Sequence, residues 1–164
     1  MGEYEHVSHT FAPVYDQESR ILILGTFPSV KSRQNDFYYG HPQNRFWRLL
    51  AELVHSAWPG TIHEKKTMLL KNKIAVWDVI ASCDIIGSSD SSIRNVVPND
   101  IAGLLRMTGI HTIYANGSTA AKLYERYVKK ETGRDIITLP STSPANATYQ
   151  MERLKERWKV ILTE

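Results

Sequence analysis

Short apolar runs alternate with amphipathic segments along the chain. Four runs are continuous in aliphatic and β-branched residues, as buried strands of parallel sheets are, and are predicted as strands: residues 20–24, 74–80, 112–115 and 136–139. Between and after them, apolar residues recur at helical spacing and predict helices over residues 45–55, 64–71, 98–109, 119–130 and 149–158. Strands that alternate with helices predict an α/β fold of three layers (α/β/α) around a central, mostly parallel, four-stranded sheet.

Three segments fall outside this alternation. Residues 3–19 are mixed in character and are predicted to be an irregular or edge segment, and residues 160–162 form a short apolar tail. Residues 82–95 are rich in Ser, Asp and Gly and form either a low-complexity linker or a second functional loop. The sequence has no internal repeat and no domain linker, so one domain over residues 1–164 is predicted.

A long polar and aromatic loop, residues 25–44, follows the first predicted strand. At about twenty residues it is longer than an ordinary connection, which favours a function. In open α/β sheets ligands bind at the carboxyl ends of strands, so the loops after the first, second and fourth strands should meet at one site. The closely spaced Tyr39, His41, Asn44 and Arg45 therefore form either a binding site or a well-packed loop with a satisfied histidine.

Composition narrows the class of protein. The formal net charge of +3 permits a polyanionic partner without requiring one. The chain has no apolar run as long as a membrane span and no signal peptide, so a cytoplasmic protein that contacts no membrane is expected. Its single cysteine, Cys83, excludes an internal disulfide and a site built from several cysteines.

Several kinds of chemistry have no support in the sequence. There is no Gly-rich phosphate loop, no Gly-x-Ser-x-Gly elbow and no metal-ligand spacing among the histidines, and His6 and His9 lie in a segment expected to be loose. Cys83 is either a nucleophile or a buried structural residue. The acid/base candidates form no obvious pair: Asp84, Asp90 and Asp100. A cleft with amides, hydroxyls and aromatics suits cleavage of an N-glycosidic bond, but composition alone does not select that reaction.

Two motifs together carry a family resemblance. One is Gly-Thr-Phe-Pro-Ser at residues 25–29 with His-Pro-Gln-Asn-Arg-Phe-Trp at residues 41–47, and the other is Pro-Ser-Thr-Ser-Pro-Ala-Asn at residues 140–146. They resemble the uracil-DNA glycosylase superfamily, in particular its hypoxanthine (deoxyinosine)-DNA glycosylase branch, and are similar to the mismatch-specific uracil/thymine-DNA glycosylases. The likeness covers nearly the whole chain and implies a uracil-DNA-glycosylase-like fold. It also implies base excision repair, in which a deaminated base, hypoxanthine first, is flipped out of DNA and released by hydrolysis.

The resemblance assigns roles to the first motif. Mismatch-specific enzymes carry their catalytic Asn where this chain has Phe27, which cannot orient water, so the water-positioning role moves to Asn44. Asn44 can alternatively be a helix N-cap. Tyr39 aligns with the aromatic that stacks on the flipped base, unless it is core packing, and Phe27 would form another wall. Backbone N–H groups around Thr26 and Phe27 can donate to the base.

The second motif departs from the superfamily pattern. Its first position, often His or Asn, is Ser141 here, and a Ser is a weaker donor to an anion than a protonated His. This argues against a strong preference for uracil. Ala145 stands where related enzymes often carry a bulkier wedge, so the wedge is expected elsewhere. Further substrate-binding candidates are Ser143, Asn146 and His41. His41 either orients Asn44 or only packs.

The expected partner is double-stranded or single-stranded DNA that contains a deaminated base. The candidates for DNA contact are Lys31, Arg33, Arg45, Ser88, Ser89 and Ser91, where basic residues interleave with aromatics or hydroxyls can hold phosphates. The serine loop can also be merely solvated. A monofunctional, monomeric enzyme without metal or cofactor is expected; the alternatives are a uracil or mismatched-thymine glycosylase, a non-catalytic module that binds damaged DNA, and an enzyme of free nucleosides.

Overall fold

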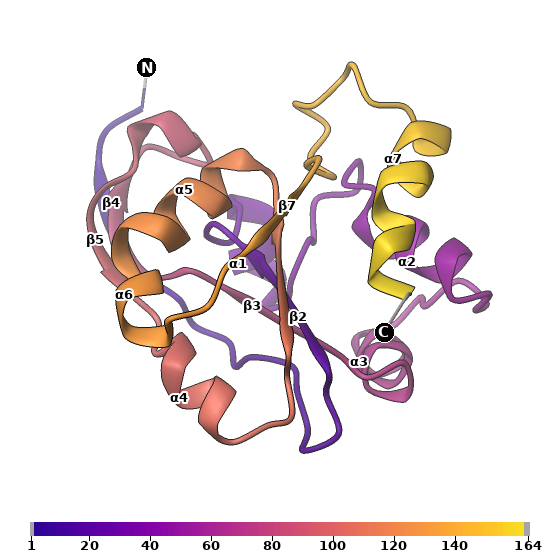
Figure 1. Ribbon diagram of the computed structural model, residues 1–164. Coiled ribbons are helices and arrows are strands. Elements are labelled where there is room, and N and C mark those ends of the chain that lie inside the picture. The colour runs from indigo at the N-terminus through magenta and orange to yellow at the C-terminus, as the bar shows by residue number, and fades with distance from the viewer. Residues whose placement is uncertain (1, 163–164) are drawn as a thin grey trace.

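The computed structural model describes residues 2–162 and is built on a central four-stranded sheet (Figure 1). Its strands lie in the order β3 (Ile74–Asp78), β2 (Ile21–Gly25), β6 (Thr112–Asn116) and β7 (Ile137–Leu139), and each neighbouring pair is parallel. All of β2 is buried, because a central parallel strand is covered on both faces. The predicted α/β fold with a parallel four-stranded sheet is confirmed.

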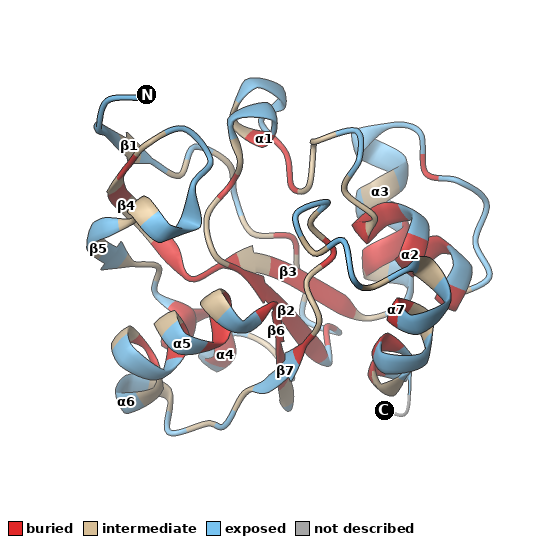
Figure 2. Cartoon of the chain, turned by 90° about the horizontal axis from the view of Figure 1, so that it is seen from above, coloured by how far each residue is buried: buried red, intermediate tan, exposed pale blue. Residues whose placement is uncertain are grey.

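One face of the sheet is covered by α2 (Phe46–Leu53), α3 (Ile62–Lys71) and α7 (Met151–Trp158). Ile21 and Ile23 of β2 point into the hydrophobic core on this side. The three helices lie together on one side of the sheet in Figure 2, with their buried stripes turned toward it. They form one outer layer of the predicted three.

The opposite face is covered by α4 (Ile101–Arg106) and α5 (Ser118–Tyr127), which pack with Leu22 and Leu24 in a second core. Successive side chains of a strand point to opposite faces, so one unbroken apolar run serves both cores. The short helix α6 (Lys129–Thr132) continues from α5 after a break at Val128, so the single helix predicted over this stretch is divided.

A second, antiparallel sheet consists of β1 (Glu5–Ser8), β4 (Ile80–Ile85) and β5 (Arg94–Pro98), in that order. The single strand predicted over residues 74–80 is therefore wrong. The chain leaves the parallel sheet after Asp78 and enters β4 directly afterwards. The apolar run over residues 74–80, interrupted only by Asp78, extends from β3 into the first residue of β4, so the pattern does not mark the change of sheet.

The long loop after β2 contains a helix that apolar periodicity did not predict, α1 (Val30–Asn35). The Ser29 side chain caps it by accepting a hydrogen bond from the N–H of Ser32. Two 3₁₀ turns complete the secondary structure, Asp90–Ser92 in the serine-rich loop and Lys159–Leu162 at the predicted apolar tail. Among residues 2–162 no helix combines the length and the apolar character needed to cross a membrane.

Asn99 joins the two sheets rather than capping α4. Its Nδ2 donates to the carbonyl oxygens of Asp78 and Ile80, at 2.9 and 3.2 Å, whereas the cap of α4 is the Asp100 side chain, which accepts from the N–H of Gly103. The helix predicted to open at residue 98 therefore begins three residues later, after the Asp100 cap. The hydrogen bonds of Asn99 fix the turn that carries Asp78 at the end of β3.

Candidate active site

A cavity of about 460 Å³ opens at the carboxyl-terminal edge of the parallel sheet. It is lined by the segments that follow β2 and β7, by the last residues of β3 and β6, and by part of the serine-rich loop after β4. The predicted meeting of the loops after three strands is therefore confirmed. This volume lies within the range of small-molecule sites, about 300–1,000 Å³.

The cavity brings together most of the candidates for catalysis and substrate binding, and two of the candidates for DNA binding, Ser88 and Ser89. Those that line it are Thr26, Phe27, Tyr39, His41, Asn44, Ser88, Ser89, Ser141 and Ser143. Asn146 lines a neighbouring cavity instead. The remaining candidates do not belong to the lining: Lys31, Arg33, Arg45 and Ser91.

Asn44 holds one fixed orientation at the start of α2. Its Oδ1 accepts hydrogen bonds from the backbone N–H of Phe46, at 2.9 Å, and from the Thr142 hydroxyl, at 2.8 Å. Because both of these partners are donors, the amide oxygen is identified and its two lone pairs are used. The N-cap of α2 is Arg45, so the alternative reading of Asn44 as the N-cap is wrong by one residue. The Nδ2 of Asn44 has no hydrogen-bond partner within residues 2–162.

A chain of polar groups stands behind Asn44. Asn116, the last residue of β6, donates from Nδ2 to Thr142 Oγ1 at 3.0 Å, and its Oδ1 accepts from the Thr142 backbone N–H at 3.0 Å. The Thr142 hydroxyl must then donate onward to Asn44. Thr142 is fully buried and Asn116 nearly so, which means that this chain is rigid. Neither residue was predicted from the sequence to belong to the site, although Asn116 ends a buried strand at the site edge.

Tyr39 forms part of an aromatic stack. Its ring lies on that of Phe46, with centroids 4.0 Å apart and planes 22° apart. Its hydroxyl oxygen is buried without a hydrogen-bond partner among the described residues, since the Asn116 amide nearby is directed at Thr142. Burial, and then the negative charge of Asp78, raise the pKa of Tyr39.

Phe27 forms a wall of the cavity and is held from behind. The ring of His9 meets it edge-on with centroids 6.2 Å apart, and the Arg33 guanidinium carbon lies 5.7 Å from its centroid. Arg33 also donates to the carbonyl oxygen of Gly87 at 3.0 Å, so it ties α1 to the serine-rich loop. A contact of Arg33 with DNA stays a prediction, beside this structural role.

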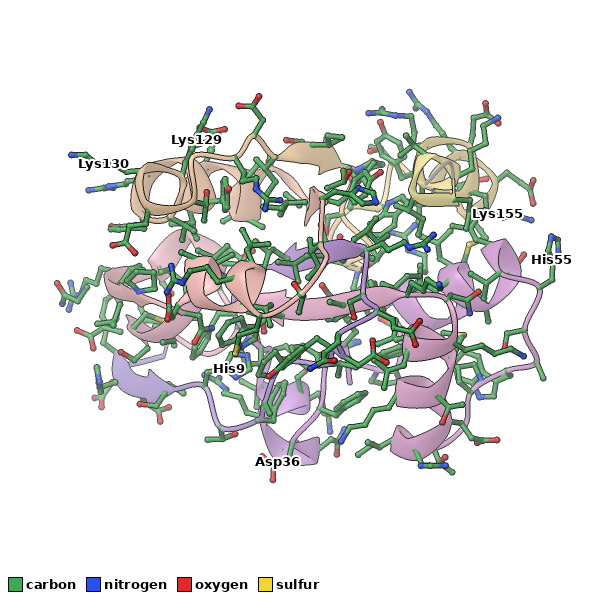
Figure 3. The ribbon with its side chains drawn as sticks, turned by 60° about the horizontal axis from the view of Figure 1, so that its bottom comes forward. His9, Asp36, His55, Lys129, Lys130 and Lys155 are labelled. Atoms are coloured by element: carbon green, nitrogen blue, oxygen red, sulfur yellow. The ribbon has the colours of Figure 1, made fainter. Side chains whose placement is uncertain are left out.

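His9 and Asp78 form a buried pair at the floor of the cavity. His9 Nε2 lies 2.8 Å from Asp78 Oδ2, and the two side chains are only 3% and 5% exposed. His9 lies within the body of the molecule in Figure 3, whereas His55 and Lys130 lie at its rim. The expectation of a loose segment around His9 is wrong, because the buried carboxylate lies too far along the sequence for local pattern to reveal it.

Arg45 holds the loop after β7 in place. Its guanidinium donates to the carbonyl oxygens of Ser143, Asn146 and Tyr149, and its backbone N–H donates to the carbonyl of Thr142. Five donors in a rigid fork suit such convergent carbonyls. The first and second sequence motifs are thereby fastened together, and a DNA contact of Arg45 stays a prediction.

The loop after β7 is also held by its own polar side chains. Ser141 Oγ accepts from the N–H of Ser143, and Ser143 Oγ accepts from the N–H of Ala145. Asn146 Nδ2 donates to the carbonyl of Ser141. Near the end of the loop that follows β2, His41 Nδ1 similarly accepts from the Gln43 N–H at 3.1 Å. These hydrogen bonds fix the backbone of the two loops. That the same residues bind the substrate stays a prediction.

The serine-rich loop closes the remaining side of the cavity. Ser88 Oγ accepts from the N–H of Val30 at 2.9 Å, and the hydroxyls of Ser89 and Ser91 lie 3.1 Å apart. Desolvation at the cavity, and then the negative charge of Asp78, raise the pKa of Asp90 although the residue as a whole is exposed. The loop is therefore docked on α1.

Metal-binding residue types do not gather in the part of the chain that the structure describes: no group of three or more His, Cys, Asp or Glu side chains is placed to share an ion. The polar groups at the cavity are instead amides, hydroxyls, the His41 imidazole and two carboxylates, of which Asp78 is paired with His9.

Comparison with known proteins identifies the family. Residues 12–162 match the model of the uracil DNA glycosylase superfamily. The chain belongs to this superfamily. It is 36% identical to a protein of Methanosarcina acetivorans named hypoxanthine DNA glycosylase, over 94% of this chain and 98% of that one. A protein of the same name from Methanosarcina barkeri is 33% identical over 90% of this chain and 93% of its own length.

A solved structure agrees with this membership. The solution NMR structure of a candidate uracil DNA glycosylase from Methanosarcina acetivorans superposes with a TM-score of 0.78 at 35% identity, and covers 92% of this chain and 93% of that one. The predicted resemblance to the superfamily and to its hypoxanthine DNA glycosylases is confirmed.

Within the superfamily, the buried groups behind the cavity were the part that sequence motifs did not reveal. Thr142 lies inside the second motif, but the sequence indicated Ser141 and Ser143 on either side of it as substrate-binding candidates. Asp78 ends a buried strand beside Gly25, its register partner, and a charged residue at such a strand end was the available signal.

Proposed function

We propose that this chain is a monofunctional DNA glycosylase that releases hypoxanthine from DNA, working as one domain over residues 1–164. The observation that carries the proposal is Asn44, which two hydrogen bonds fix at a cavity large enough for a flipped base. The named relatives support the choice of hypoxanthine, because they cover nearly the whole chain.

In this proposal Asn44 holds the attacking water. Its oxygen is already occupied, so Nδ2 donates to one lone pair of the water and leaves another to attack the sugar C1′. The water oxygen bonds to C1′, and the bond from C1′ to the base nitrogen breaks with its electron pair. The departing base takes up a proton and the water loses one, so the sugar is left abasic.

The flipped base needs an aromatic surface and donors. Tyr39, stiffened by its stack on Phe46, offers the ring on which the base lies, and Phe27 offers the facing wall. Backbone N–H groups of Thr26 and Phe27, with the hydroxyls of the loop after β7, stabilise the negative charge that develops on the leaving base. His41 is proposed to border the same base.

The duplex is proposed to lie across the mouth of this cavity. Lys31 is exposed and free to meet a phosphate, and the serine-rich loop offers the hydroxyls of Ser89 and Ser91. Three other candidates already hold loops in place: Ser88, Arg33 and Arg45. Any contact that they make with DNA is additional to these hydrogen bonds.

Base release from defined duplexes tests the function. Duplexes with a single deoxyinosine, uracil or xanthine, and an undamaged control, are incubated with the protein and then heated in alkali to cut abasic sites. Preferential cutting at deoxyinosine is expected. Cutting at uracil alone would overturn the substrate, and binding without any cutting would make this a non-catalytic module.

Asn44→Ala tests the catalytic residue. We expect excision to fall at least about 100-fold, because a positioned water is lost. Stability should fall by about 1–2 kcal/mol, because the Phe46 N–H and the Thr142 hydroxyl both lose their acceptor. Gln43→Ala, an exposed neighbour in the same loop, is the matched control and should keep its rate. Unchanged single-turnover release by a folded Asn44→Ala protein would refute the assignment.

A further inference from the structure

The floor of the cavity holds a carboxylate that is only half used. Asp78 ends β3 and lines the cavity, and its Oδ2 accepts from His9 Nε2 at 2.8 Å. Its Oδ1 accepts no hydrogen bond within residues 2–162. Because Asp78 lines the cavity, a polar ligand bound there can supply the partner that the protein does not give this oxygen.

His9 is built to hold that carboxylate in one orientation. Its ring is enclosed by Phe11 and Tyr38, with centroids 4.5 and 5.8 Å away, and its backbone N–H donates to the carbonyl of Ala81 at 2.7 Å. An ionised carboxylate can only accept, so the proton of this hydrogen bond lies on His9 Nε2, and Asp78 Oδ1 is left as a second acceptor. The Asp78 side chain therefore cannot turn away from the cavity.

The space in front of the free oxygen exists because residue 25 is a glycine. A Cβ on Gly25 would lie 2.4 Å from Asp78 Oδ1 and 2.9 Å from the Tyr39 hydroxyl oxygen. That hydroxyl is buried without a partner among the described residues. Two polar atoms beside one glycine thus lack partners in the described part of the chain, and the buried hydroxyl is an independent sign of a polar ligand at this place.

We propose that Asp78, oriented by His9, is the specificity-determining acceptor that reads a ring N–H of the deaminated base. The proposal rests on the proposed function. Deamination turns the N1 of adenine, which is an acceptor, into the N1–H of hypoxanthine, which is a donor. A carboxylate accepts only, so it binds hypoxanthine and repels the N1 lone pair of adenine. Guanine also carries an N1–H, so its rejection falls to other groups.

The contact is tested by changing its donor in the base and its acceptor in the protein, separately and together. Single-turnover release is measured for deoxyinosine and for 1-deaza-2′-deoxyinosine, in which C–H replaces N1–H, with the wild type and with Asp78→Asn. The wild type should release the deaza base roughly 10- to 100-fold more slowly, the size of a hydrogen bond to a charged group. Asp78→Asn should release hypoxanthine slowly and should release the deaza base only a little more slowly than that. The deaza substitution also changes the leaving group, but this effect on the rate is the same in both proteins and cancels when their rate ratios are compared.

Asp78→Asn is nearly isosteric and also inverts the contact. His9 still donates to the amide oxygen, so the amide N–H₂ faces the base and meets N1–H as a second donor. Discrimination between deoxyinosine and deoxyadenosine should therefore shrink. His9→Gln keeps a donor and should preserve sensitivity to N1–H, whereas His9→Ala should lose it with a larger effect on KM than on kcat, as expected of a positioning residue.

The outcomes separate the two proposals. If the wild type releases hypoxanthine but handles the deaza analogue equally well, the role of Asp78 is overturned and the glycosylase stands; this comparison needs no variant to fold. Equal sensitivity to N1–H in the wild type and in folded Asp78→Asn would also overturn it. Failure of the wild type to release any base would remove both.

Discussion

At the scale of single residues, the active site is defined by which polar atoms are satisfied and which are not. Asn44 has its oxygen fully bonded, whereas its amide nitrogen and one polar atom each of Tyr39 and Asp78 have no partner among residues 2–162. A polar atom without a hydrogen bond costs free energy, and the packed surroundings hold the side chain in place despite this cost. Groups left unsatisfied in an otherwise bonded interior mark where a ligand belongs.

The unpartnered hydroxyl of Tyr39 predicts a gain in stability on its removal. Tyr39→Phe should raise the free energy of unfolding by about 1 kcal/mol, because a buried hydroxyl without a partner costs about that much or more. The neighbouring Tyr38 is the control, since its hydroxyl donates to the carbonyl of Ala12 at 2.8 Å and Tyr38→Phe should lower stability by about the same amount. Urea denaturation measures both, and a loss of stability in Tyr39→Phe would show that its hydroxyl is bonded.

At the scale of elements, the small antiparallel sheet positions the site without lining most of it. β1 pairs with β4 from Glu5 to Ser8, and the next residue along the chain, His9, reaches the cavity floor. Side-chain bonds across this sheet reinforce the pairing: Asp84 of β4 accepts from Asn95 Nδ2 at 2.7 Å and lies 2.8 Å from His6 Nδ1. An element that resembled a loose terminal segment therefore supports the chemistry.

These bonds give the sheet a defined dependence on pH. The hydrogen bonds from Asn95 and then His6 lower the pKa of Asp84 below its ordinary 3.8. A lowered carboxyl pKa contributes stability that is present above the ordinary value and is lost as the pH falls through the folded-state value. Asp84→Asn should therefore be less stable than the wild type at neutral pH, with a difference that disappears in acid. Urea midpoints across this range measure it, and a difference independent of pH would contradict the assignment.

At the scale of the whole molecule, the parallel sheet gathers residues far apart in sequence at one edge. Arg45 and the loop after β7 are joined by several hydrogen bonds, and His9 and Asp78 by another. With a formal net charge of +3, the chain has no large excess of positive charge to draw DNA at long range. Binding should therefore rely on local contacts with phosphates around the cavity.

Salt dependence tests this view of binding. The affinity for a deoxyinosine duplex should fall linearly with salt concentration on a log–log plot, because phosphate contacts release counterions. Lys31→Ala should reduce the slope by about one and weaken damaged and undamaged duplexes equally. Gel-shift or anisotropy titrations at several salt concentrations measure both. Affinity that is insensitive to salt would favour an enzyme of free nucleosides.

The α/β class, a parallel four-stranded sheet, the two motifs and the family could all be inferred from the sequence, because apolar periodicity and short motifs are local properties. Which groups those motifs contact depends on the tertiary structure. The turn between β3 and β4 is hidden in one apolar run, and the bonds of Asn44 to Thr142 and of Asp78 to His9 join residues about a hundred and about seventy positions apart. Such pairings depend on how the sheet folds the chain back on itself, so no local pattern could reveal them.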